Sequence, residues 1–134
     1  MTLYLDASAL FKRYVTETGS DVVAPLLKAN PRWVAAIHTY AEISINLGRR
    51  LGGRGLAIAV AQFERDWDAI QIVALDDNLC RRAGAIGVQY RLRTLDALHL
   101  AAAERAGGAE LTVVTFDDRL AAGARAMGFP VAGL

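Results

Sequence analysis

The sequence has only one cysteine, no long hydrophobic run and almost no net charge. Cys80 stands alone among 134 residues, which excludes an internal disulfide and a zinc site built from cysteines. The 15 lysine and arginine residues nearly balance the 14 acidic ones, which leaves a formal net charge of +1. The field of the whole molecule is therefore not that of a general nucleic-acid binder, and any contact with RNA or DNA must depend on local groups.

Segments for membrane insertion or targeting are also lacking. No apolar stretch approaches the ~18 residues that a membrane span needs. The N-terminus has no basic region followed by an apolar one, and Asp6 interrupts the only candidate. We therefore expect a cytoplasmic protein with no membrane partner. With 54% hydrophobic residues, the chain can bury one core but is too short for two, so we expect a single domain over residues 1–134.

Short runs of β-forming residues alternate with longer segments of helical periodicity. Strands are predicted at residues 3–5, 33–37, 70–75 and 111–115, with a short final one after Pro130. Helices are predicted at residues 9–14, 20–29, 40–51, 56–70, 77–88, 94–106 and 117–127. This alternation predicts an α/β fold, a three-layer α/β/α sandwich around a mainly parallel sheet of four to five strands.

Four acidic residues stand close to the points where helices should begin: Asp6, Glu42, Asp96 and Asp117. Asp6 ends the first predicted strand, Glu42 follows the second, and Asp117 follows the strand at 111–115. Since the carboxyl ends of parallel strands share one edge of a sheet, we expect these three side chains to meet there. Asp96 follows a helix and a loop, so its spacing alone does not place it with the others.

Each acid also has a purely structural interpretation. Asp6 and Asp117 could be N-caps, Glu42 could complete a capping box with Thr39, and Asp96 could complement a helix dipole. Caps do not require a charge, however, because serine, threonine and asparagine serve as well. Several carboxylates gathered at one edge repel each other unless a cation lies between them, so together they favour a divalent metal site.

The segments LYLDASALFKRY, YAEISINL, LRTLDALHLAAA and VVTFDDRLAA resemble the successive motifs of PIN-domain ribonucleases, in particular the VapC-type toxins of bacterial type II toxin–antitoxin systems. The resemblance covers essentially the whole chain in order and length. It implies a PIN-like fold and a metal-dependent endoribonuclease that acts as a toxin. It further implies that the catalytic and metal-binding residues are Asp6, Glu42, Asp96 and Asp117.

In such an enzyme the cofactor would be Mg²⁺ or Mn²⁺, with Ser8 and Thr115 as near neighbours of the acids. The resemblance also implies that the loop before Thr94 brings Asp96 into the site. Water activated by the metal would attack the phosphodiester and leave a 5′-phosphate and a 3′-hydroxyl. Asp118 adds a neighbouring acid, and we favour Asp117 because it stands where the motif has its acid.

The family resemblance also implies partners beyond the RNA substrate, namely a cognate antitoxin protein and a second copy of the chain in a homodimer. The helical hairpin predicted at residues 40–70 agrees with such association. Its stripe of Leu56, Val60, Phe63 and Trp67 is wide for a domain of this size to cover. The alternative function is a catalytically silent PIN-like module that binds RNA or protein, which would normally have lost one of the acids.

Two histidines, one asparagine and several basic residues are weaker candidates for roles in metal or RNA binding. His99 follows Asp96 by three residues on one helix, but we expect it to be a packed helix residue, because the only other histidine is His38 and the sequence shows no zinc motif. Asn46 could face the same crevice as Glu42. Basic residues that could contact phosphates are Lys12, Arg13, Arg49, Arg50, Arg54, Arg91 and Arg93.

Overall fold

The computed structural model describes all residues from 1 to 134 and contains one five-stranded sheet. Its strands are β1 (Thr2–Leu5), β2 (Arg32–Ala36), β3 (Gln71–Val73), β4 (Leu111–Thr115) and β5 (Val131–Gly133). The strand order is β3-β2-β1-β4-β5, and every neighbouring pair is parallel. The short strand expected after Pro130 therefore exists and lies at one edge of the sheet.

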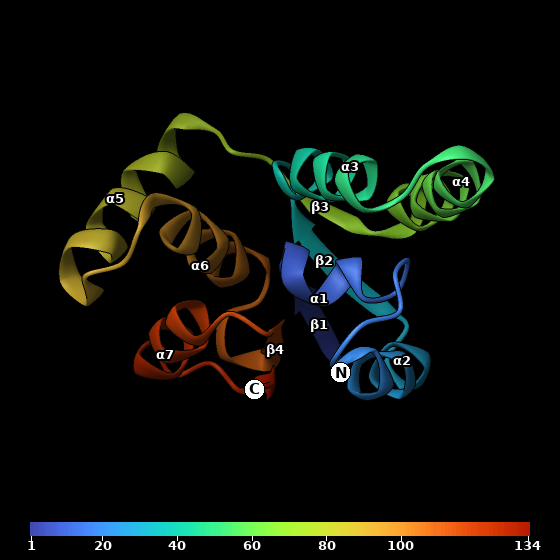
Figure 1. Cartoon of the computed structure of the whole chain (residues 1–134). Coiled ribbons are helices and arrows are strands. Elements are labelled where there is room, and N and C mark those ends of the chain that lie inside the picture. The colour runs from blue at the N-terminus through green and yellow to red at the C-terminus, as the bar shows by residue number, and fades with distance from the viewer.

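Helices cover both faces of this sheet (Figure 1). They are α1 (Ala7–Phe11), α2 (Ser20–Ala29), α3 (Thr39–Arg50), α4 (Gly53–Ala69), α5 (Asp77–Tyr90), α6 (Thr94–Ala106) and α7 (Asp118–Ala126), with a 3₁₀ turn at Gly108–Glu110. In Figure 1 helices α5 to α7 lie on one side of the strands and α1 to α4 on the other. The predicted three-layer α/β/α sandwich is confirmed.

Two hydrophobic cores, one on each face of the sheet, hold the layers together. The expectation of a single core was therefore wrong, because a sheet covered by helices on both sides separates the buried side chains into two groups within one domain. Successive side chains of a strand point to opposite faces, so Leu3 and Leu5 pack with α1 to α4, whereas Tyr4 packs with α5 to α7. All three side chains are completely buried. Burial on both faces explains why β1 has a nearly continuous hydrophobic sequence rather than an alternating one.

The position of β1 in the middle of the sheet determines where ligands can bind. From β1 the chain moves outward through β2 and β3 on one side, and later through β4 and β5 on the other. The connections after β1 and β4 therefore diverge at the carboxyl edge and leave a crevice between them. No helix in the structure combines the length and the apolar character that crossing a lipid bilayer would require.

Candidate active site

A cavity of about 580 Å³ opens at the carboxyl edge of the sheet, and all four predicted acids line it. They are Asp6 after β1, Glu42 on α3, Asp96 on α6 and Asp117 before α7. The structure therefore brings together residues that lie far apart in the chain. Asp96, which spacing alone could not place, arrives on the first turn of α6.

Asp6 is held rigidly and is only 4% exposed. One carboxylate oxygen accepts the backbone N–H of Ala9 at 2.9 Å and thereby caps α1. Ser8 donates its hydroxyl to the carboxylate at 2.8 Å, and Thr115 donates to the second oxygen at 2.5 Å. Burial raises the pKa of Asp6, while His99 and these hydrogen bonds lower it and offset part of the effect. The N-cap interpretation is therefore correct, and Asp6 also lines the cavity.

Asp117, like Asp6, both caps a helix and lines the cavity. Its Oδ1 accepts the backbone N–H groups of Arg119 and Leu120 at 2.9 and 3.0 Å, which caps α7. Its Oδ2 stays free of hydrogen bonds to the backbone and lies 3.9 Å from Arg93. The adjacent Asp118 is exposed and does not line the cavity, which agrees with the choice of Asp117 over its neighbour.

Asp96 is 6% exposed and its buried Oδ2 has no hydrogen-bond partner. Burial raises the pKa of Asp96, the nearby charge of Asp117 raises it further, and Arg93 at 3.6 Å opposes both effects. A buried carboxylate oxygen that has no hydrogen bond and lies beside a second acid is costly, and a divalent cation would satisfy both acids. The acidic donor set therefore fits a hard ion such as Mg²⁺ or Mn²⁺.

Glu42 does not form the capping box that its spacing from Thr39 allowed. The Thr39 hydroxyl has no partner, and α3 has no side-chain cap. Glu42 instead turns its Oε1 toward His99 Nε2, at 3.2 Å. Burial pushes the pKa of Glu42 upward, but the contact with His99 outweighs it, so the net pKa lies below the ordinary value.

The two histidines form a cluster that sequence reasoning missed. The rings of His38 and His99 have centroids 4.5 Å apart, and His38 Nε2 lies 3.4 Å from Glu42 Oε1. His99 is 4% exposed, so it is a packed helix residue as expected, but the structure also brings it together with His38 and Glu42 as a group that could hold a metal ion. Burial, followed by the charge of His99, lowers the pKa of His38 to about 4. The sequence offered one indication of this cluster, because His38 and Glu42 are four residues apart, which is about one helical turn.

Three of the seven candidate RNA-binding cations pair with acidic residues outside the cavity. Lys12 and Arg50 both pair with Glu17, at 2.7 and 3.0 Å, and Arg13 pairs with Asp66 at 2.6 Å. Arg93 differs, because its side chain is 61% exposed and lines the acidic cavity. Arg93 is therefore the basic residue best placed to meet an anion that enters there.

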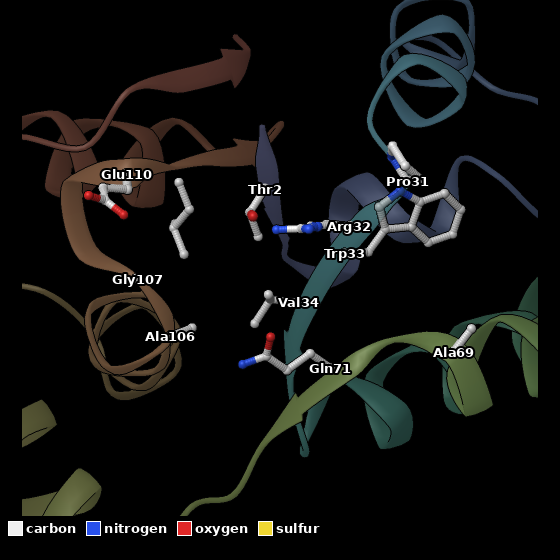
Figure 2. A pocket seen from close by; sticks show the side chains of 11 residues that line it. Thr2, Pro31, Arg32, Trp33, Val34, Ala69, Gln71, Ala106, Gly107 and Glu110 are labelled. Atoms are coloured by element: carbon white, nitrogen blue, oxygen red, sulfur yellow. The ribbon is translucent and has the colours of Figure 1, made fainter.

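A second cavity, of about 340 Å³, lies at the amino ends of the strands, opposite the first one (Figure 2). Figure 2 shows Thr2, Arg32, Gln71 and Glu110 around it, together with the ring of Trp33. Glu110 is its only acid, and it contains no histidine. This cavity has no group of carboxylates that could hold a cation.

The profile described as "PIN domain" matches residues 3–126. This protein belongs to the PIN-domain family. Ribonuclease VapC49 of Mycobacterium tuberculosis (strain ATCC 25618 / H37Rv) is 34% identical over 135 residues, which cover 97% of this chain and 94% of that protein. The resemblance to VapC-type PIN domains that the four motifs indicated is thus confirmed.

Solved structures have the same fold as this PIN domain at low sequence identity. Mycobacterium tuberculosis VapC20, titled a sarcin–ricin loop cleaving toxin, superposes with a TM-score of 0.69 at 21% identity, over 90% of this chain and 93% of that one. A VapBC-5 structure from the same species, titled a member of the VapBC family of toxin–antitoxin systems, gives a TM-score of 0.66 at 20% identity, over 99% and 98% of the two chains.

Proposed function

We propose that this PIN-domain protein is a metal-dependent endoribonuclease that acts as the toxin of a toxin–antitoxin pair. The observation that carries the proposal is the meeting of Asp6, Glu42, Asp96 and Asp117 around one cavity at the carboxyl edge of the sheet. Retention of all four acids argues against a catalytically silent module. A fold alone does not define an activity, so the chemistry of this cavity has to support it.

The residues that would hold Mg²⁺ or Mn²⁺ are Asp6 and Asp96 at the buried end, with Asp117 and Glu42 completing the acidic set. When bound, a divalent ion of this kind supplies an activated water and neutralises charge on the phosphate that is attacked. The ligand oxygens are hard donors, as these ions prefer.

The chain's own residues prepare this site before any substrate arrives. Ser8, Thr115 and the Ala9 N–H fix the carboxylate of Asp6 through four hydrogen bonds, so Asp6 needs little reorganisation to bind. The exposed guanidinium of Arg93 stands over Asp96 and Asp117, where it can bind a phosphate of the incoming strand.

RNA is the proposed substrate because of this cavity and because the curated relatives that match nearly the whole chain bear the name ribonuclease. The relative VapC46 of Mycobacterium tuberculosis is 31% identical over 96% of this chain. The motifs of the acids and their common cavity agree with that reaction class.

A cognate antitoxin and a second copy of the chain are the proposed protein partners. Structural neighbours include VapBC complexes, which supports an antitoxin. The predicted hairpin α3–α4 exists, but Phe63 is buried in the chain's own core, so its apolar stripe is narrower than expected. Hydrophobic side chains that remain exposed on the hairpin are Tyr40, Ile45, Ile58 and Val60.

The test is incubation of the purified protein with total RNA and Mg²⁺ or Mn²⁺, followed by sequencing of the product ends. Asp6→Asn is the informative variant, because asparagine can still cap α1 while the carboxylate charge is lost. Asp118→Asn is the matched control, since it removes the same charge outside the cavity. We expect discrete cuts with 5′-phosphates in the wild type and the control only. Cutting that persists in chelator, or equally in Asp6→Asn, would refute the proposal.

A further inference from the structure

A compact group of nitrogen and oxygen atoms shares Glu42 and His99 with the lining of the acidic cavity but differs from the four acids in chemistry. His38 immediately precedes α3, Glu42 follows one helical turn later, and His99 comes from α6. The potential ligand atoms of these three side chains all lie within 4.8 Å of one another. Two imidazoles and one carboxylate therefore converge from two helices that are distant in the sequence.

The spacing of these atoms agrees with a common ion between them. Glu42 Oε1 lies 3.2 Å from His99 Nε2 and 3.4 Å from His38 Nε2. Ligand atoms bound tetrahedrally to zinc, at the usual bond lengths, are separated by about 3.4 Å. Two of the three separations thus already match those that a small divalent ion would impose, and the third is within 4.8 Å.

The same atoms lack hydrogen bonds. Neither ring nitrogen of His38 has a partner, and Glu42 Oε1 makes no well-oriented hydrogen bond although both histidines are near. Buried polar atoms in native proteins are almost always paired, because leaving one unpaired costs free energy. Two of these unpaired atoms, His38 Nε2 and Glu42 Oε1, lie close to each other and to His99 Nε2, which indicates a missing partner that can accept electron pairs from them.

A further contact orients His99 for ligation. Its Nδ1 lies 2.7 Å from the hydroxyl of Tyr4, a side chain that is completely buried. Histidines that bind metals commonly use one ring nitrogen for the ion and the other for a hydrogen bond to an oxygen. Tyr4 supplies that oxygen and leaves Nε2 of His99 directed at Glu42.

We propose that His38, Glu42 and His99 form a binding site for a borderline transition-metal ion of the Zn²⁺ class. Two imidazole nitrogens with one carboxylate oxygen suit such ions, whereas the neighbouring acids suit Mg²⁺ or Mn²⁺. Glu42 is common to both sets of ligands. His38 and Asp6 each belong to one set only, so substitutions at these two positions distinguish the sites.

The experiment titrates metal-free protein with Co²⁺, whose visible absorption reports nitrogen and oxygen ligation, and then displaces it with Zn²⁺. The wild type should bind one equivalent whose visible spectrum shows nitrogen ligation. His38→Gln should weaken binding by more than about 100-fold, because even residues that only support a ligand contribute 10- to 100-fold. Asp6→Asn should keep an affinity close to that of the wild type, since Asp6 is not a ligand of this group, and in any case far above that of His38→Gln. No RNA is required, so the result does not depend on nuclease activity.

A second measurement needs no variant. The chain has only two histidines, and both belong to this group, so ring-nitrogen NMR signals report the site directly. Saturating Zn²⁺ should shift the signals of both rings. The proposal is overturned if neither ring responds, if His38→Gln keeps the wild-type affinity, or if Asp6→Asn loses it.

Discussion

The two cavities at opposite ends of the same parallel sheet differ sharply in their chemistry. The one at the carboxyl edge, about 580 Å³, contains four acids and His99, whereas the one at the amino edge, about 340 Å³, contains a single acid. Both lie beside the same central strands. The difference shows that cavity shape alone does not make a functional site, because only one end combines a crevice with convergent charged groups.

The carboxyl-edge cavity also differs in its energetics. Asp6 and Asp96 are buried there as potential anions, with one oxygen of Asp96 unpaired, and this destabilises the metal-free fold. At the amino edge Arg32 and Glu110 remain solvent-exposed and impose no such penalty. Buried charged groups that lower stability are expected where they serve a function. Substitutions at the carboxyl edge should therefore lower activity without lowering stability, whereas substitutions at the amino edge should change neither.

The largest expected effect is the loss of RNA cleavage in Asp96→Asn. Removing a carboxylate that is proposed to bind the metal directly should cost more than about 100-fold in rate, because substitutions of residues that only support metal ligands already cost 10- to 100-fold. Rates of cleavage at a mapped site under fixed Mg²⁺ measure this. Glu110→Gln, which makes a similar change at the opposite cavity, should stay at the wild-type rate. Equal losses in both variants would remove the distinction between the two ends.

A second effect is stabilisation by metal. An ion that binds only the native state at 100 times its Kd adds about 2.7 kcal/mol. Melting curves should therefore show the wild type and Glu110→Gln shifted upward by Mn²⁺, and Asp96→Asn almost unchanged. A shift that Asp96→Asn shares with the wild type would place the ion elsewhere.

A smaller effect concerns pH in the absence of metal. Burial raises the pKa of Asp96, so the native state holds this proton more tightly than the unfolded chain does. The wild type should therefore lose stability as pH rises from about 4, the ordinary carboxyl range, through the raised pKa. Asp96→Asn lacks this loss and should melt above the wild type at neutral pH, where 1 kcal/mol corresponds to about 4 °C. Denaturation in chelator across this range should show the gap closing toward pH 4, and a constant gap would contradict the assignment.

The smallest effect is expected at the amino edge. Arg32→Ala should change the free energy of unfolding by no more than about 0.5 kcal/mol, the usual range for surface substitutions away from special features. Its cleavage rate should equal that of the wild type. Arg93→Ala, at the other cavity, should weaken RNA binding through loss of a phosphate contact. Binding curves at several salt concentrations would distinguish the two. A smaller salt dependence is expected for Arg93→Ala alone.

The fold was largely predictable because its signals are local. Helix α2, strand β4 and helix α6 occupy the predicted residues, each with strong periodicity or a clear boundary. Helix α1 begins two residues before the prediction, immediately after Asp6, because the Asp6 side chain caps it. Apolar periodicity alone did not specify that start.

The site was predictable only in part, since side-chain partners depend on tertiary contacts. Asp6, Glu42 and Asp117 could be placed together because the carboxyl ends of parallel strands share one edge of a sheet. Asp96 was placed only by the family resemblance. The pairing of Glu42 with His99 instead of Thr39 could not be predicted, because it requires α3 and α6 to meet. For the same reason the nearness of His38 and His99 became apparent only in the structure.

The most direct test of the central claim is anomalous diffraction from crystals of the protein grown with Mn²⁺. The account predicts a peak in the carboxyl-edge cavity, with carboxylate oxygens of Asp6 and Asp96 at roughly 2.0–2.2 Å, distances usual for small hard ions. Asp96→Asn crystals should lack that peak. A fully occupied wild-type ion bound away from these two carboxylates, or no peak at saturating Mn²⁺, would contradict it.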